Sequence, residues 1–266
     1  MFGEKIKMTK NIRSEILTVF QMETAALKMQ TRFSEGDMLE WQQKVRGDPM
    51  KDKKEVRAIV EALKAKYPES LCSLQYEKDY ELLFAVRLSA QCTDERVNKV
   101  TPALFERFPT LEAFAQADPK EVGEYIHSCG FFNGKSRDLV NCARMLLEEY
   151  GGKVPGEMED LLRLPGVGRK TANLIQGDVF NIPGVVVADT HCIRISGRLG
   201  LTDGTKDPKK VEDQLRKILP PEESNHFCHR LVLFGREVCT ARRAMCEVCP
   251  LCDWCTHYQT SGGARE

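Results

Sequence analysis

Apolar residues recur at helical spacing along most of this chain. Clear examples are Tyr80, Leu83, Phe84 and Leu88; Leu139, Cys142, Ala143, Leu146 and Leu147; and Val211, Leu215 and Ile218. Intervals of three and four residues place side chains on one face of an α-helix, whereas a half-buried strand would alternate. Pro and Gly separate these stretches, at Gly130, Gly151, Gly152, Pro155, Gly156, Pro165, Gly166, Pro183, Gly184, Pro220 and Pro221, as in the short connections between packed helices. The pattern predicts an all-α fold.

Capping residues indicate where two of the helices begin. Asp207 followed by Pro208 predicts an N-cap and a proline at the first helical position. We expect Asp94 to cap a helix over residues 95–108. Residues 1–50 differ from the rest of the chain. A helical pattern at 16–29 has no obvious second apolar segment against which it could pack. We predict that they form an N-terminal extension of unknown role, helical or partly disordered.

The charge balance limits how this chain could bind nucleic acid. Its 266 residues carry no net charge at pH 7, so any affinity for phosphates must come from locally placed basic groups. No apolar run approaches eighteen residues, and the first twenty residues include Lys5, Lys7, Lys10 and Arg13. This pattern fits neither a membrane span nor a signal peptide, and we expect a cytoplasmic protein.

The eleven cysteines fall into two sets. Cys72, Cys92, Cys129, Cys142, Cys192 and Cys228 are widely spaced, and we interpret them as small buried hydrophobic residues. The others follow the pattern Cys239-x6-Cys246-x2-Cys249-x5-Cys255, with Cys252 as an extra member. Four thiolates at such spacing can enclose one metal centre. The spacing alone leaves open zinc or iron–sulfur, and also the evenly spaced set that includes Cys252.

The segment 164–172, with the sequence LPGVGRKTA, lies between two helical stretches, Met158–Arg163 and residues 169–180. We expect Gly166 and Gly168 to let the chain turn tightly and to leave backbone N–H groups uncovered at the start of the second helix. Uncovered N–H groups and the positive end of a helix dipole form an anion site, which a DNA phosphate would fit. The alternative is an ordinary glycine-bearing turn.

This segment resembles the helix-hairpin-helix element of the endonuclease III family. The motifs LSAQCTD at 88–94 and VADTH at 187–191, and the cysteine cluster, are similar to the same family in the same order. The similarity runs from about residue 56 to residue 258. It implies two helical domains with the active site in the cleft between them. One is a helical barrel domain over 72–182 that contains the hairpin at 158–180, and the other is an iron–sulfur domain made of 51–71 and 183–260.

The resemblance also implies a bifunctional DNA glycosylase and AP lyase of base excision repair, monomeric and associated with a bacterial-type nucleoid. Its partner would be duplex DNA with damaged bases or abasic sites. Lys170 would attack the sugar C1′ to form a Schiff base, and Asp189 would take up a proton and stabilise the cationic sugar. Because only a neutral amine attacks, we expect Lys170 to be buried in a cleft at a positive helix N-terminus. The sequence also predicts Asp189 as the N-cap of a helix over Thr190–Leu199, and the residue can have both roles or the capping role alone.

Further roles follow from the same resemblance. Gln91 would enter the duplex and fill the gap left by a flipped nucleotide, while Asp94 and His191 would line the pocket. Phosphates would be bound at the hairpin and in the loop between the first two clustered cysteines, by Gly166, Gly168, Arg169, Arg242 and Arg243. A 4Fe-4S cluster would be held by Cys239, Cys246, Cys249 and Cys255, and would chiefly shape that loop.

The sequence favours two other functions less. A sister branch of the superfamily removes adenine from mismatches without lyase activity, and it carries a serine or another residue where Lys170 stands. An electron carrier or a non-catalytic DNA-binding module is the other alternative, although neither needs the pair Lys170 and Asp189. Oxidised or ring-broken pyrimidines are the expected substrates from the resemblance alone.

Overall fold

The computed structural model describes residues 51–260, and helices account for nearly all of the regular structure in that range. The only β-type pairing in this part of the chain is an isolated bridge between Cys239 and Ala244. The predicted all-α fold is therefore confirmed. The extension predicted for residues 1–50 lies outside the described residues. Between residues 51 and 260, no helix has the length and apolar character needed to cross a membrane.

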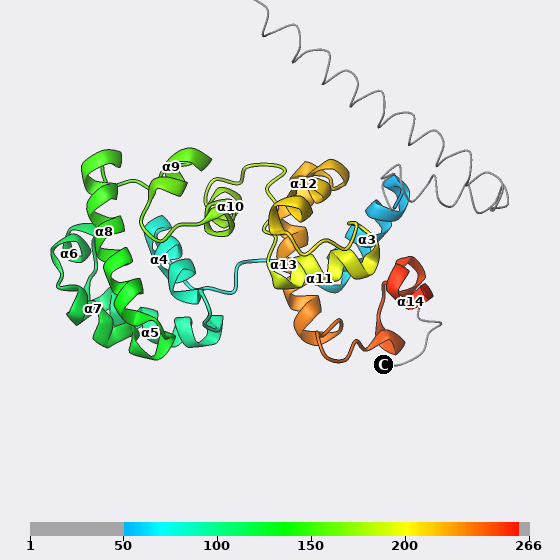
Figure 1. Ribbon diagram of the computed structural model, residues 1–266, viewed down its shortest axis with the longest axis horizontal. Helices are drawn as coiled ribbons and strands as arrows, with labels where there is room; N and C mark the ends of the chain where they lie inside the picture. The colour runs from blue at the N-terminus through cyan, green and yellow to red at the C-terminus, as the bar shows by residue number, and fades with distance from the viewer. Residues whose placement is uncertain (1–50, 261–266) are drawn as a thin grey trace, which may run out of the picture. The chain divides into compact units, whose positions relative to one another are not determined.

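One group of helices runs from α4 to α10 (Figure 1). Its core centres on α8, which packs against α4, α6 and α7. Phe114 of α6 is fully buried, and its ring lies 4.9 Å from that of Phe84 and 5.2 Å from that of Phe108. These contacts join three helices. The bounds are α4 Asp79–Ser89, α5 Asp94–Arg107, α6 Leu111–Gln116, α7 Pro119–Ile126, η1 His127–Cys129, α8 Phe132–Tyr150, α9 Met158–Arg163 and α10 Arg169–Asp178.

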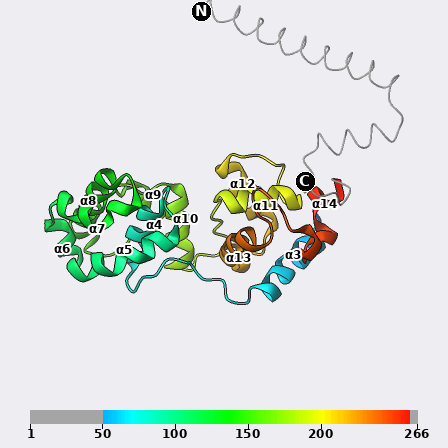
Figure 2. The same cartoon turned by 90° about the horizontal axis from the view of Figure 1, so that it is seen from below.

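A second group is formed by α3 and the helices from α11 onward (Figures 1 and 2). Its central helix is α13, which packs against both α3 and α11. A Cβ atom at Gly235 of α13 would lie 2.3 Å from the Nδ1 atom of His191, so glycine permits the close approach of α11. The bounds are α3 Lys53–Lys66, α11 Thr190–Leu199, α12 Pro208–Ile218, η2 Pro221–Glu223, α13 Ser224–Glu237, η3 Cys246–Val248, η4 Cys252–Trp254 and α14 Thr256–Thr260.

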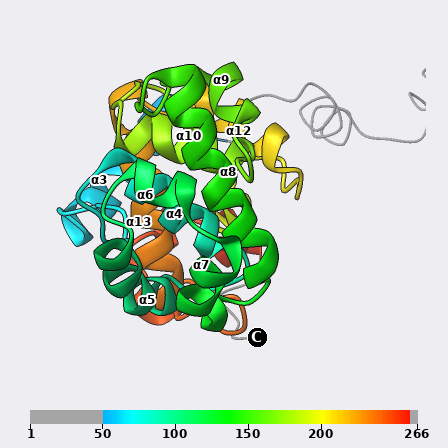
Figure 3. The same cartoon turned by 90° about the vertical axis from the view of Figure 1, so that its left-hand side faces the viewer.

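The two groups are joined by direct contacts between α10 and α13. Asp178, at the end of α10, accepts hydrogen bonds of 2.7 Å from Asn225 Nδ2 and from His229 Nε2 of α13. Seen from the side of α6, the first group lies in front of α13 (Figure 3). The described residues, 51–260, belong to one compact unit, and the predicted domain limits at 71–72 and 182–183 stay a prediction.

Of the two helix starts predicted from capping residues, one is confirmed and one is wrong. Asp207 caps α12 by accepting from the backbone N–H of Lys209, as predicted. The prediction that Asp94 caps α5 is wrong, because the side chain of Thr93 accepts from Arg96 N at 3.3 Å. Asp94 is instead the first residue of α5. Its carboxylate accepts from groups far away along the chain.

Candidate active site

A cavity of about 200 Å³ lies between the two helix groups, with walls from α4, α10, α11 and α13. It is lined by Asp94, Lys170, Asp189 and His191, which were all predicted from the sequence to lie at the active site or its pocket. Further lining comes from residues 71–74 and from α13. The fold thus brings together groups that are up to a hundred residues apart in the sequence.

Lys170 and Asp189 both stand at helix N-termini on this cavity. Lys170 is the second residue of α10, and its side chain is exposed. The expectation that Lys170 is buried is therefore wrong, because a side chain in the first turn of α10 has no preceding helical turn to cover it. Asp189 is half-buried and accepts from the backbone N–H of Cys192 at 2.7 Å, which confirms the capping interpretation. The cap holds this carboxylate at the cavity.

The hairpin before Lys170 depends on Gly166. Its backbone is left-handed, with φ of 76°, and a Cβ atom there would lie 2.5 Å from Nε of Arg87 and 2.9 Å from Oδ2 of Asp138. Those two residues form an ion pair of 2.6 Å beneath the turn. Glycine is needed at position 166 both for the backbone conformation and for this close approach.

Gly168 has a different role from the one expected. Its φ of −103° is open to any residue, so the expectation that both glycines permit the turn is wrong for this position. Gly168 is the N-cap of α10, and no side chain caps the helix there. The N–H groups of the first turn therefore lack the capping partner that helix starts usually have. Phosphate binding at this helix start stays a prediction.

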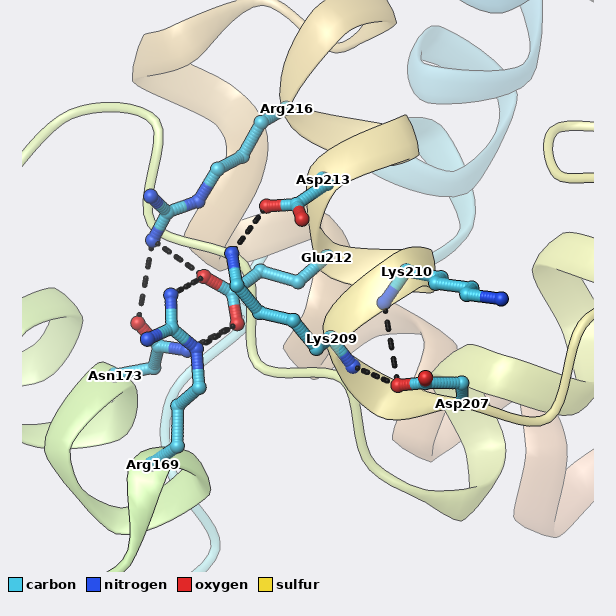
Figure 4. Close-up of polar contacts among 8 residues, drawn as sticks. All are labelled: Arg169, Asn173, Asp207, Lys209, Lys210, Glu212, Asp213 and Arg216. Atoms are coloured by element: carbon cyan, nitrogen blue, oxygen red, sulfur yellow. Dashed lines mark hydrogen bonds and ion pairs between the residues drawn. The ribbon is translucent and has the colours of Figure 1, made fainter. Parts of the chain in front are cut away.

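Arg169 is engaged by a buried carboxylate (Figure 4). Its Nε and Nη2 atoms donate to the two oxygens of Glu212 at 2.8 and 2.7 Å. Glu212 is only 2% exposed, and it also accepts from Asn173 at 3.0 Å and pairs with Arg216 at 3.0 Å. Arg169 thus fastens α10 to α12. Its contact with DNA, expected from the resemblance, stays a prediction.

We expect Glu212→Ala to destabilise the protein by about 2–3 kcal/mol, because it leaves Arg169, Asn173 and Arg216 without their shared acceptor. This is less than for fully buried pairs, since the arginine side chains are more than one third exposed. Denaturant unfolding measures the effect. The matched control is Asp213→Ala, which removes an exposed carboxylate that pairs with Lys209 on the same helix and should cost at most about 1 kcal/mol. Equal losses in both variants would contradict the proposed importance of this cluster.

Asp94 and His191 have defined partners at the cavity. The carboxylate of Asp94 accepts from Ser73 Oγ at 2.5 Å and from Arg236 Nη2 at 2.8 Å. His191 lies 3.3 Å from Arg194 Nη2, and burial lowers the pKa of its imidazole below the ordinary value. His191 is therefore mainly neutral at pH 7 and can either donate or accept a hydrogen bond.

Gln91 lies beside this cavity rather than in its lining. It is exposed, with a left-handed backbone of φ 54°, and the next residue, Cys92, lines the cavity. Of the six scattered cysteines, Cys129, Cys142, Cys192 and Cys228 are buried as predicted. The prediction is wrong for Cys72 and Cys92, which are only partly buried and face the cavity.

The C-terminal cysteines surround a second, small apolar cavity. Its lining includes Cys239, Cys246, Cys249 and Cys255 but not Cys252. The Cys252 thiol instead donates to the backbone carbonyl of Cys246 at 2.8 Å. Burial raises the pKa of Cys249 to about 12. Among residues 51–260, no three His, Cys, Asp or Glu side chains meet closely enough to hold a single ion.

The loop between the first two of these cysteines carries Arg242 and Arg243, both exposed. The loop is closed at its base by the bridge between Cys239 and Ala244. Inside it, the backbone N–H of Arg243 donates to Thr240 Oγ1 at 3.1 Å. The two guanidinium groups are accordingly presented to solvent on a short, internally bonded loop.

Known proteins resemble both the sequence and the fold. The model of the HhH-GPD superfamily base excision DNA repair proteins matches residues 84–221. Endonuclease III of Synechocystis sp. is 46% identical over 209 residues, which cover 79% of this chain and 95% of the relative. For endonuclease III of Bacillus subtilis the identity is 36% over 206 residues, with 77% and 94% covered. The chain belongs to the endonuclease III family.

Solved structures of endonuclease III share this fold. A trapped covalent intermediate of endonuclease III with DNA, an estranged-adenine complex, is 37% identical with a TM-score of 0.75, covering 80% of this chain and 99% of that one. A thermostable thymine-DNA glycosylase, 21% identical with a TM-score of 0.71 over 78% of this chain and 98% of that one, shares the fold. The superfamily match contains Lys170 and Asp189 but ends before the cysteine loop.

In this member of the endonuclease III family, sequence reasoning missed several residues at the site. His229 and Arg236 of α13 line the cavity, and their spacing of seven residues places them on one helix face. In the sequence, two polar residues seven positions apart among apolar residues could have indicated that this helix face lies at a functional site. Outside the cavity lining, Phe131 is 72% exposed and has a left-handed backbone, with φ of 49°. In the sequence, an aromatic residue directly after Gly130, at a predicted break between helices, was the available signal.

Proposed function

We propose that this chain is a bifunctional DNA glycosylase and AP lyase that removes damaged pyrimidines, oxidised ones above all, from duplex DNA and then cuts the strand. The observation that carries the proposal is the cavity shared by the amine of Lys170 and the carboxylate of Asp189. A nucleophile and a group that can take up its proton are the minimum for Schiff-base chemistry at a sugar carbon. A binding module or an electron carrier would need neither group there.

The reaction proceeds in two stages. In the first, the nitrogen of Lys170 bonds to C1′ while the bond from C1′ to the base breaks, and the base leaves with the electron pair. Asp189 takes up the proton that the amine releases, and its negative charge stabilises the cationic sugar. In the second stage the sugar ring opens to an imine, C2′ loses a proton and the bond from C3′ to oxygen breaks. Water then hydrolyses the imine and frees Lys170.

The exposure of Lys170 is compatible with this chemistry because the substrate is large. A duplex bound across the hairpin would itself cover the first turn of α10 and exclude water from the amine. The helix N-terminus adds a positive potential at the same place. The protein thus contributes the positive N-terminus of α10, and the bound DNA shields the amine of Lys170 from water.

Duplex DNA would be held by local groups, as the zero net charge requires. The uncapped start of α10, with Gly166 and Gly168 before it, would accept one phosphate. The exposed Arg242 and Arg243 would contact others. Gln91 stands beside the cavity and would fill the space left by the extruded nucleotide. A single chain carries all of these groups, which supports action as a monomer.

The cavity would receive the extruded base. Its lining offers a carboxylate already paired with a guanidinium, Asp94 with Arg236, together with the imidazoles of His191 and His229. Carbonyl and N–H groups on the edge of a pyrimidine would find both donors and acceptors there. This lining supports recognition through hydrogen bonds, while oxidised pyrimidines in particular are proposed from the family.

We propose that the cysteine loop binds a 4Fe-4S cluster through Cys239, Cys246, Cys249 and Cys255. The fit is supported by the four side chains around one apolar cavity and by the engagement of Cys252 with a backbone carbonyl. Four cysteine ligands are the usual donor set for this group. When bound, the cluster would act as a covalent cross-link that fixes the loop bearing Arg242 and Arg243.

Replacing one proposed ligand should release iron, whereas replacing Cys252 should not. We expect Cys246→Ala to lower the iron and sulfide content of the purified protein to a small fraction of that in the natural chain, because three thiolates leave one iron uncoordinated. Cys252→Ser is the control, since serine still provides a donor for the carbonyl of Cys246. Normal iron content in Cys246→Ala, or its loss in Cys252→Ser, would contradict the proposed ligand set.

The proposed activity is tested by incubating the full chain with duplexes that each carry one lesion: thymine glycol, dihydrouracil, oxidised guanine, an abasic site or an adenine mismatch. We expect base release and strand nicking on the pyrimidine lesions, nicking at the abasic site, and a covalent adduct when borohydride reduces the imine. Base release from the mismatch without nicking would instead favour the adenine glycosylase branch. Inertness toward every duplex would leave only a binding or electron-transfer role.

A further inference from the structure

Two exposed residues, one between α4 and α5 and one between η1 and α8, have unusual backbone conformations. Among residues 51–260, the residues other than glycine with positive φ are Gln91, Phe131 and Asn181. Asparagine adopts this conformation readily, whereas a bulky aromatic residue rarely does. Such a conformation costs about 1–3 kcal/mol and persists only where the surroundings enforce it. Gln91 and Phe131 must therefore be held in place by neighbouring structure.

Lys135 of α8 is the group that joins the two loops in which they lie. Its side chain is fully buried, at 1% exposed. The ammonium donates to the carbonyl oxygens of Leu88 and Ala90 at 2.8 Å each and to that of Cys129 at 2.9 Å. An ammonium has three donors, and all of them are used on backbone carbonyls.

The three acceptors lie directly before the two strained residues. Leu88 and Ala90 are at the C-terminal end of α4, where carbonyl groups lack helical partners and favour a positive charge. Ala90 precedes Gln91, and Cys129 ends η1 two residues before Phe131. Both loops are thus bound to one buried cation.

The exposed ring of Phe131 is available for contact with another molecule. A side chain of this size is normally buried, yet 72% of it faces solvent, and neighbouring Phe132 packs against the core. An apolar side chain that enters a base step unstacks the duplex, and stacking on an aromatic ring contributes about 1–3 kcal/mol per base. Phe131 and Gln91 are therefore suited to enter the duplex together.

We propose that Lys135 is a positioning residue that holds Gln91 and Phe131 as a pair of probes, so that both enter the duplex while the damaged nucleotide is extruded into the cavity. The proposal rests on the proposed function, because it concerns how the same site opens its substrate. Lys135 touches neither substrate nor reacting atoms. Its effect should accordingly appear only on substrates that have to be opened.

The test compares an abasic site in a duplex with the same abasic site in a single strand, which has no stack to open. Lys135→Met removes the ammonium but keeps most of the side-chain volume. We expect its single-turnover cleavage of the duplex to fall by about 10- to 100-fold, with the rate on the single strand unchanged. Phe131→Ala should show the same selective loss, while Lys120→Met, an exposed lysine of α7, should change neither rate.

A second readout follows the opening of the duplex directly. 2-Aminopurine placed opposite the abasic site becomes more fluorescent when it is unstacked, and we expect binding of the natural chain to raise that fluorescence. Lys135→Met and Phe131→Ala should abolish the rise. If Lys135→Met does not fold, Lys135→Gln, whose amide can still donate to two carbonyls, should fold and show a smaller loss of the same kind.

The outcomes distinguish the positioning role of Lys135 from the lyase activity on which it rests. Equal losses on the duplex and the single strand in the lysine variants, or no loss on either, would overturn the positioning role while leaving the lyase activity intact. If the natural chain cleaves neither substrate, the proposed function fails, and this inference fails with it. A selective loss on the duplex together with a lost fluorescence rise supports the inference.

Discussion

Lys170→Ala is expected to remove the covalent chemistry and leave DNA binding. Without the amine no Schiff base can form, so the borohydride adduct should disappear and single-turnover nicking of abasic duplex should fall by roughly 10³-fold or more. The fold should be unaffected, because Lys170 is exposed and α10 stays fastened to α12 through Arg169 and Glu212. Gel-shift titration of a duplex with an uncleavable abasic analogue should give an affinity close to that of the natural chain.

The matched control for this variant is Lys120→Ala, which removes an exposed lysine from the first turn of another helix, α7. It should retain both the adduct and the nicking rate. An adduct that survives in Lys170→Ala would show that a different amine forms the Schiff base, and the assignment of Lys170 would have to be abandoned.

The second large effect is expected for Asp189→Asn, which separates the charge of this residue from its cap. Asparagine caps helices about as well as aspartate, so the hydrogen bond to Cys192 N and the start of α11 should be kept. The amide can neither take up the proton of the amine nor stabilise a cationic sugar. We expect the single-turnover rate of base release to fall by about 10²- to 10⁴-fold with DNA affinity unchanged.

Asp189→Ala serves as the comparison, since it removes both the charge and the cap. It should lose as much activity as Asp189→Asn and, in addition, about 0.5–2 kcal/mol of stability in denaturant unfolding. Normal turnover in Asp189→Asn would leave the residue with its capping role alone. A parallel loss of DNA binding would likewise argue against a role in the chemical step.

Helix positions were predictable where the signal lies within a few residues of the sequence. The helices Met158–Arg163 and Thr190–Leu199 begin and end as expected, and Asp207 with Pro208 starts α12. The helix predicted over 169–180 ends two residues earlier, at Asp178. Capping and apolar periodicity act through contacts three to four residues away, so a linear pattern contains them.

Partners across the fold were not predictable in this way. Asp94 has the residue type of a cap, yet Arg236 and Ser73 bind its carboxylate and Thr93 takes the cap. Arg169 has the type and place of a phosphate ligand, yet Glu212 occupies it, 43 residues along the chain. The residues next to Asp94 and Arg169 in the sequence do not indicate that these distant partners would bind them.

By itself the sequence determined the all-α class, the family and the residue types of the site, because periodicity, capping and motif order are local properties of a chain. Only the tertiary structure decided that Lys170 is exposed, that four separate helices enclose one cavity, and that Lys135 binds carbonyl groups of two loops. Burial and charge pairing depend on which distant segments meet. Which distant segments come into contact depends on the packing of the whole core, and no single sequence motif determines it.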